Sequence, residues 1–131
     1  MGMEYLAGFF DADGHVGMTK NGVELIVAGQ VRSPLLRFQA EFGGSIYEDW
    51  GRYQKRGSYA FFTWRCPAVA KERMISSLLP HMTVKGPQAW EALRFLQEGK
   101  PRGQERQGYV KSIRRLKNDA REPLMALLGA S

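Results

Sequence analysis

The segment that most constrains this chain is a short apolar run near its start, Leu6-Ala7-Gly8-Phe9-Phe10-Asp11-Ala12-Asp13-Gly14. Small residues recur within it, and it ends in two carboxylates followed by a glycine. The pattern predicts a helix over residues 4–12 that stops at Asp13-Gly14. The small side chains would let a second copy of this helix pack closely, and two-fold pairing would bring two Asp13 side chains together. One chain is therefore expected to hold half of a site.

The length and charge of the chain indicate one small domain with a polyanionic partner. The 131 residues fit a single domain, 1–131, with a C-terminal helical part at about 101–131. The chain has 19 Lys and Arg against 13 Asp and Glu, and the net charge of +6 favours nucleic acid as the partner.

The cysteine count and the lengths of the apolar runs exclude several other classes of protein. Cys66 is alone, so an internal disulfide and a cysteine metal cluster are both excluded, which fits a reducing compartment. No apolar run approaches membrane-span length, and no Gly-rich nucleotide loop or zinc-ligand spacing is present. We expect a soluble intracellular protein with neither a membrane nor a small-molecule partner. The cytoplasm, the nucleoid and an organelle all remain possible compartments.

Alternating and periodic stretches divide the rest of the chain into elements. Asn21-Gly22 lies between two extended runs and is a strong hairpin signal. A second pair of alternating runs flanks a polar loop, and Ser33-Pro34 begins a helical stretch between the two hairpins. We expect strands at 15–20, 23–31, 45–50 and 58–65, helices at 4–12, 33–42, 69–79, 87–97 and 109–128, a surface linker at 100–108, and a break or restart of the last helix at Pro123.

This order predicts an α/β (α+β) fold of the pattern αββαββα. Two hairpins would form one antiparallel sheet, shaped like a saddle, with helices on one face only. The other face would be free to lie in the major groove of DNA. Both alternating faces of strand 23–31 are largely apolar, so the sequence leaves open which of its residues would face DNA.

The carboxylates at the end of the first helix indicate metal-dependent phosphodiester chemistry. Carboxylates brought close together repel unless divalent cations lie between them, and Mg²⁺ prefers carboxylate, water and phosphate oxygens. Such ions polarise a phosphoryl oxygen and help to deprotonate an attacking water. A bare Asp-x-Asp-Gly sequence is more often a simple helix end, so the whole nine-residue run has to carry this interpretation.

The nine-residue run resembles the motif of the LAGLIDADG homing endonucleases, with Phe9-Phe10 at its centre. The resemblance extends over most of the chain and is weakest in the last third. The further matching segments are the first hairpin, Gln30 at a strand end, Leu35-Leu36, Glu41-Phe42-Gly43-Gly44, Leu78-Leu79-Pro80 and Lys85. A single copy of the motif implies a homodimer that reads a near-palindromic duplex.

The resemblance implies roles for individual residues. Asp13 would be the catalytic carboxylate and a metal ligand, with the backbone carbonyl of Ala12 as a second ligand. Gln30 and Lys85, and less securely Arg32, would organise solvent around the scissile phosphates. Mg²⁺ is the expected cofactor, for which Ca²⁺ or Mn²⁺ can substitute. The dimer interface would comprise Ala7, Gly8, Asp11 and Ala12, with Asp11 supporting the helix end.

We expect the free sheet face and one helix to contact DNA. Base contacts are expected from polar and aromatic residues on the strands and hairpin loops, namely Thr19, Asn21, Glu48, Trp50, Arg52, Gln54, Lys55 and Arg56. Phosphate contacts near the edge of the site are expected from Lys111, Arg114, Arg115 and Lys117. His15 stays outside the predicted catalytic set, as a residue that contacts a phosphate or water.

The leading functional hypothesis is a site-specific homing endonuclease encoded within a mobile intron. As a homodimer it would cleave both strands of a long, near-palindromic DNA target in a divalent-metal-dependent reaction. The alternatives on the same fold are an intron RNA maturase and a DNA-binding regulator that does not cleave. A small basic structural protein, whose first helix serves only dimerisation, is a third possibility.

Overall fold

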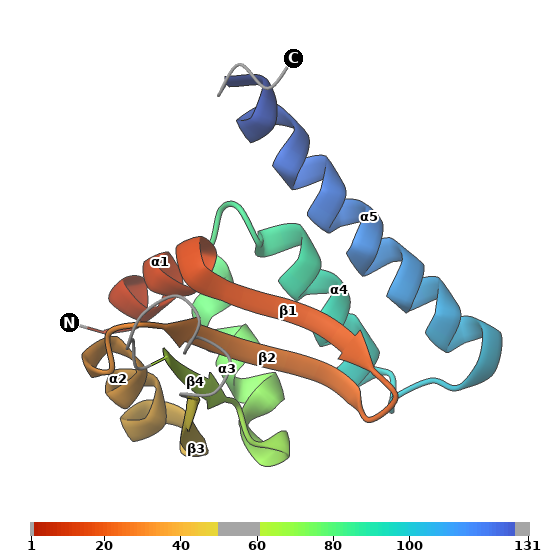
Figure 1. Ribbon diagram of the computed structural model, residues 1–131. Coiled ribbons are helices and arrows are strands. Elements are labelled where there is room, and N and C mark those ends of the chain that lie inside the picture. The colour runs from red at the N-terminus through yellow and green to blue at the C-terminus, as the bar shows by residue number, and fades with distance from the viewer. Residues whose placement is uncertain (1, 50–60, 128–131) are drawn as a thin grey trace.

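The computed structural model describes residues 2–49 and 61–127, and its elements follow the predicted order (Figure 1). The helices and strands are α1 (Met3–Asp13), β1 (Gly14–Thr19), β2 (Gly22–Gly29), α2 (Ser33–Phe42), β3 (Ser45–Asp49), β4 (Phe61–Arg65), the 3-10 turn η2 (Ala68–Ala70), α3 (Lys71–Leu78), the 3-10 turn η3 (Leu79–His81), α4 (Gly86–Gln97) and α5 (Gly103–Leu127). The predicted helix 69–79 is thus a shorter α-helix with a 3-10 turn at each end.

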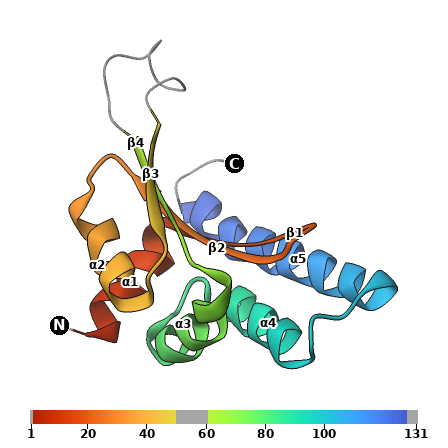
Figure 2. The ribbon, with the colours of Figure 1, turned by 90° about the horizontal axis from the view of Figure 1, so that it is seen from below.

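The strands form one antiparallel sheet of four, in the order β1-β2-β4-β3. Figure 2 shows that α1 to α4 lie on one side of this sheet, while its other side carries no helix among the residues that the structure describes. The first hairpin turn comprises Lys20 and Asn21, and Gly22, which has a positive φ of 109°, begins β2. The turn therefore lies one residue earlier than predicted, with the glycine taking the left-handed conformation.

The strand register assigns each side chain to one face of the sheet. Paired residues of antiparallel strands point to the same side, and Val16–Leu25 and Val27–Trp64 are buried pairs on the helix side. The neighbouring pairs therefore lie on the open face, which carries His15, Gly17, Thr19, Glu24, Ile26, Ala28, Thr63, Arg65, Ser45 and Tyr47. This answers the question left open by strand 23–31, because Glu24, Ile26 and Ala28 face outwards.

An aromatic group joins α1 and α2 to the helix side of the sheet. The rings of Phe10 and Phe38 have centroids 6.5 Å apart, and Phe38 lies 5.1 Å from Trp64. All three side chains are buried, and the Trp64 indole nitrogen donates a 2.9 Å hydrogen bond to the carbonyl of Gly43. These contacts hold α1 against the sheet, and so determine where its C-terminal carboxylates lie.

α1 passes into β1 without an intervening loop, because residue 14 is a glycine. An added Cβ at Gly14 would lie 2.4 Å from the Phe10 ring and 2.6 Å from the Phe10 carbonyl oxygen. Any larger residue would force the ring out of the core. The glycine therefore couples the end of α1 rigidly to the first strand.

The C-terminal region differs from the prediction. The expected linker 100–108 is wrong from residue 103 onwards, since α5 begins at Gly103, and α5 continues to Leu127 without ending at Pro123. Proline removes one backbone hydrogen bond from a helix but does not have to terminate it. The polar residues of the supposed linker form the solvated face of the first turns, ahead of Tyr109 and Ile113, which are buried.

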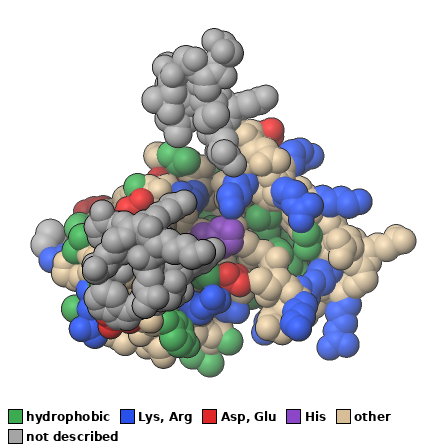
Figure 3. Space-filling view, viewed as in Figure 1, with side chains coloured by type: hydrophobic (Ala, Val, Ile, Leu, Met, Phe, Trp, Pro, Cys, Tyr) green, Lys and Arg blue, Asp and Glu red, His purple; other side chains and the backbone are tan. Residues whose placement is uncertain are grey.

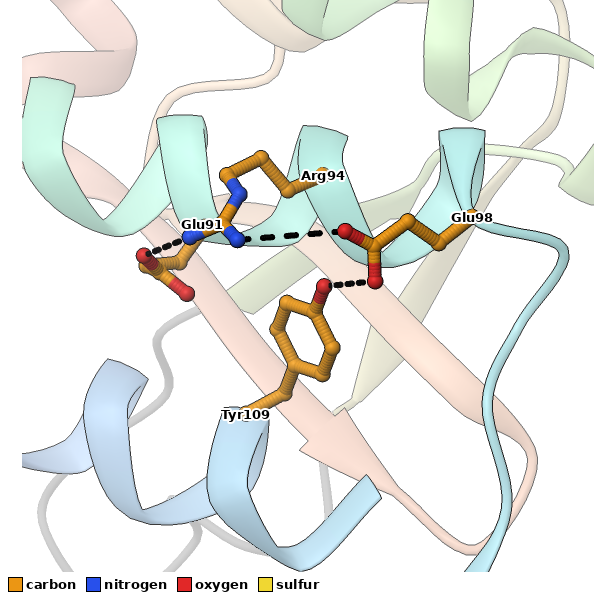
Figure 4. Close-up of polar contacts among 4 residues, drawn as sticks. All are labelled: Glu91, Arg94, Glu98 and Tyr109. Atoms are coloured by element: carbon orange, nitrogen blue, oxygen red, sulfur yellow. Dashed lines mark hydrogen bonds and ion pairs between the residues drawn. The ribbon is translucent and has the colours of Figure 1, made fainter. Parts of the chain in front are cut away.

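Contacts between α4 and α5 fix the position of the long helix. The Phe95 and Tyr109 rings meet edge to face with centroids 5.4 Å apart. The Tyr109 hydroxyl donates a hydrogen bond to Glu98, and Arg94 joins Glu98 to Glu91 through N–O distances of 3.8 and 3.0 Å (Figure 4). α5 is thereby held alongside β1, the edge strand of the sheet. None of the described helices is long and apolar enough to cross a membrane.

Candidate DNA-binding and cleavage site

Asp13 is the last residue of α1, at the point where the chain enters the sheet. Its side chain is exposed, and it accepts no hydrogen bond from any described residue. Among the residues that the structure describes, no group of three or more His, Cys, Asp or Glu side chains converges as a metal site. A carboxylate oxygen is a suitable ligand for Mg²⁺, and the Ala12 residue beside it is also exposed. The donor set of one chain therefore fits part of a divalent-metal site.

Asp11 binds the loop between η3 and α4. Its carboxylate accepts hydrogen bonds from the Thr83 backbone N–H at 2.6 Å, the Thr83 hydroxyl at 2.9 Å and the Lys85 backbone N–H at 2.8 Å. Burial raises the pKa of Asp11, but the hydrogen bonds from Lys85 and Thr83 outweigh it, and the pKa lies below its usual value. Asp11 stays ionised and ties residues 83–85 to the end of α1.

Lys85 lies beside both carboxylates of α1. Its ammonium group donates a 2.5 Å hydrogen bond to the backbone carbonyl of Asp11. Burial, together with the charge of Lys117, lowers the pKa of Lys85 by more than the charges of Asp11 and Asp13 raise it. The structure thus brings Asp13 and Lys85 together, although they are 72 residues apart in sequence (85 − 13).

Gln30 and Arg32 occupy the segment between β2 and α2. Both side chains are exposed, Gln30 in the bend after the strand and Arg32 at the residue before the helix. Neither forms a hydrogen bond or an ion pair with Asp13 or Lys85 in the described part of the chain. Their assignment to the cleavage site stays a prediction.

The expected dimer residues divide between two sides of α1. Ala7 differs from the expectation, because it has no exposed surface in the single chain and packs in the core with Leu6 and Phe10. Gly8 and Ala12 are exposed four residues apart, so they share a helix face, and an added Cβ at Gly8 would meet nothing within 4 Å. Close packing of a second helix would therefore involve Gly8 and Ala12, with Ala7 supporting them from within.

The predicted base-contacting residues are only partly described. Trp50, Arg52, Gln54, Lys55 and Arg56 lie outside the described residues. Thr19 is on the open face, but its hydroxyl accepts a 3.1 Å hydrogen bond from the Asn21 N–H and so stabilises the hairpin turn. Glu48 pairs with Phe62, in the row that carries Ile46 and Trp64, whereas Tyr47 is on the open face with 55% of its surface exposed. The alternation places Tyr47 where Glu48 was expected.

Basic side chains of α5 extend along the open edge of the sheet. Lys111, Arg114, Arg115 and Lys117 are all exposed, and Figure 3 shows Lys and Arg side chains gathered over α5 on this side of the molecule. Arg114 and Lys117 line a groove of about 190 Å³ between α5 and β1, which also includes His15 and Gly17. Arg106 at the start of the helix donates a hydrogen bond to the carbonyl of Thr19. Thus α5 adds positive charge beside the open face.

The arrangement of sheet and helices is a fold found in the homing endonucleases. Comparison with solved structures shows this directly and confirms the fold implied by the LAGLIDADG resemblance. The archaeal intron-encoded homing endonuclease I-Vdi141I, complexed with DNA, is 15% identical over 92% of this chain and 82% of its own, with a TM-score of 0.59. No protein-family profile and no curated protein sequence matches the chain.

The homing endonuclease I-CvuI has the same fold. In complex with its target Sro1.3 and 2 mM Ca, it is 19% identical over 90% of this chain and 78% of its own, with a TM-score of 0.57. In complex with the I-CreI target in 2 mM Mg, with the DNA not cleaved, it is 18% identical with a TM-score of 0.54 over the same shares. At these identities the comparison shows the fold alone.

Thr83 was not among the predicted site residues, and His15 was predicted only to contact a phosphate or water. Thr83 supplies two of the three hydrogen bonds that hold Asp11, and only its position two residues before Lys85 hints at this role. His15 lies next to Lys117, with 3.4 Å between its Nδ1 and the lysine Nζ. Its position immediately after the carboxylate motif was a visible signal, but the contact with α5 depends on tertiary structure.

Proposed function

We propose that this protein is a site-specific DNA endonuclease that acts as a homodimer and cleaves both strands of a near-palindromic duplex with a divalent metal ion. The observation that carries the proposal is that the exposed Asp13 carboxylate and the Lys85 ammonium, which donates a hydrogen bond to the Asp11 carbonyl, both lie at the end of α1. The solved structures with this fold, I-Vdi141I and I-CvuI, are complexes with DNA, which supports a double-stranded DNA substrate.

The residues of this chain suit metal-assisted hydrolysis of a phosphodiester. Asp13 and the Ala12 carbonyl would hold the metal ion together with the same groups of a second copy and DNA oxygens. A bound Mg²⁺ supplies Lewis acidity toward the phosphate and lowers the pKa of a water molecule. Lys85, held by Asp11, would place positive charge where the phosphate gains negative charge. Gln30 and Arg32 are proposed to orient water at the same phosphate.

Dimerisation completes the site, because one chain offers a single free carboxylate at the end of α1. Gly8 and Ala12 form the small exposed face over which two copies of α1 can approach. The two Asp13 residues would then lie next to each other on the symmetry axis, one for each DNA strand. The open sheet faces of the two copies would extend from this axis along the major groove in opposite directions.

The first experiment is selection of duplexes from a random DNA library by the protein in Ca²⁺. The retained pool is then incubated with the protein in Mg²⁺, and cleavage is followed on a gel. We expect a long, near-palindromic motif and double-strand cleavage of the pool. Short, sequence-independent and salt-sensitive retention would instead favour RNA binding or a structural role.

The decisive variant is Asp13→Asn, which removes the metal-binding charge and keeps the size of the side chain. We expect loss of Mg²⁺-dependent cleavage, with dimerisation and binding in Ca²⁺ retained. Glu72→Gln is the matched control, because it removes one exposed carboxylate charge from α3, away from the site. Cleavage by Asp13→Asn at the wild-type rate would falsify the proposed function.

A further inference from the structure

A contact between α5 and the first strand lies directly beside the proposed cleavage site. The Lys117 ammonium is 3.4 Å from the Nδ1 atom of His15, although the two residues are 102 positions apart. His15 belongs to the open face of β1 and comes two residues after Asp13. Lys117 therefore lies at the carboxylate end of the sheet.

The imidazole ring of His15 can lie against the sheet because Gly17 has no side chain to displace it. Residues 15 and 17 share the open face, and an added Cβ at Gly17 would lie 2.5 Å from the His15 Nε2 atom. The ring thus lies along the strand over Gly17, with its other nitrogen directed to Lys117. Neighbouring residues therefore hold His15 in a half-buried position, which distinguishes it from a free surface side chain.

The positive charge of Lys117 has no ion-pair partner within residues 2–49 and 61–127. This charge acts unfavourably on His15 and on Lys85, whereas Lys85 also has the carboxylates of Asp11 and Asp13 nearby. Glu24, across the strand pair from Gly17, is the acidic group that acts on His15, and Glu24 is already paired with Arg65 at 3.7 Å. Like charges gathered in an open groove are relieved when an anion binds.

We propose that His15 and Lys117 form an anion subsite that holds a backbone phosphate of DNA next to the phosphate attacked at Asp13. The proposal rests on the proposed function and adds α5 to the cleavage site. Lys117 would supply the charge, and His15 would donate or accept a hydrogen bond at the bound strand. Gly17 would act as a positioning residue, since it allows the ring to lie against the sheet.

The test compares Lys117→Met with Lys100→Met in the duplex pool retained from the random library in Ca²⁺. Both substitutions remove one exposed positive charge, but Lys100 lies between α4 and α5 and belongs to neither the proposed cleavage site nor the predicted DNA contacts. We expect Lys117→Met to lower the single-turnover cleavage rate in Mg²⁺ at saturating protein by roughly tenfold or more. Lys100→Met should leave this rate within about twofold of wild type. Lys117→Arg should restore most of the rate, because it restores the charge.

The salt dependence of binding provides a second readout that a structural role would not change. Loss of one phosphate contact should reduce the slope of log affinity against log salt by about one unit in Lys117→Met. Gly17→Ala and His15→Asn should each lower the cleavage rate, and combining either with Lys117→Met should add little, since the pair acts as a unit. Thermal unfolding of each variant separates these effects from loss of folding.

The outcomes distinguish this subsite from the proposed function. If Asp13→Asn abolishes cleavage while Lys117→Met and Lys100→Met behave alike, the endonuclease assignment stands and the subsite is refuted. If wild-type protein retains duplexes but cleaves none of them, the cleavage function fails. The difference between the two lysine variants in the slope of log affinity against log salt then still tests whether Lys117 binds a phosphate.

Discussion

Replacing Asp11 with alanine tests whether this carboxylate, and not its more exposed neighbour Asp13, holds the site together. The substitution leaves the Thr83 N–H, the Thr83 hydroxyl and the Lys85 N–H without their acceptor. Each such hydrogen bond contributes about 0.5–1.5 kcal/mol, and water can reach this half-exposed site, so we expect a total loss of about 2–4 kcal/mol. For a chain of this length, that loss corresponds to a Tm lower by roughly 8–16 °C.

The matched variant for this prediction is Thr83→Val, which removes the hydroxyl donor and keeps the backbone donor. It should reduce the free energy of unfolding by about 0.5–1.5 kcal/mol, well below the effect of Asp11→Ala. Urea unfolding of the three proteins, with the slope against urea checked for constancy, gives the comparison. An Asp11→Ala protein within about 0.5 kcal/mol of wild type would refute the inference that residue 11 anchors the loop.

The pH dependence of the difference in stability between wild type and Asp11→Ala gives an independent check of this role of Asp11. Because the pKa of Asp11 in the folded protein is below its ordinary value of 3.8, the carboxylate contributes stability above that pH. The contribution is lost as the pH falls through the lowered pKa. The stability gap between wild type and Asp11→Ala should therefore be constant above about pH 5 and should narrow below pH 3.8. A gap that does not change with pH would contradict the role of the ionised carboxylate.

Two further predictions concern the proposed dimer face and the single cysteine. Gly8→Leu should leave the monomer folded, since nothing lies within 4 Å of its added Cβ, but should disrupt the proposed dimer in sedimentation velocity; a persistent dimer would exclude this interface. Burial raises the pKa of Cys66 to about 11, more than the charges of Lys71 and Arg73 lower it, so the native thiol should resist alkylation at pH 8. Urea-unfolded protein should react fully, and rapid labelling of the native state would refute the buried position.

Much of the fold was predictable from local sequence signals, because each signal acts over a few residues. The small-residue helix, the hairpin at residues 20–22, the helix that begins at Ser33-Pro34 and the final amphipathic helix are all present. The linker prediction failed at Gly103 because a polar segment can continue a helix whose buried residues come later. The extension of α5 through residue 123 shows the same limit, since one proline does not decide the end of a 25-residue helix.

The candidate cleavage site divides into a local part and a tertiary part. The sequence by itself determined that two carboxylates end the first helix, that a hairpin follows, and that Lys85 and the basic residues of the last helix were candidates. Only the tertiary structure decided which carboxylate is free, because Asp11 is engaged by Thr83 and Lys85 from another part of the chain. It also decided that Ile26 faces outwards, that Ala7 faces the core, and that Lys117 lies beside His15. Periodicity reports which residues share a face, but only packing against other elements selects the face that is buried.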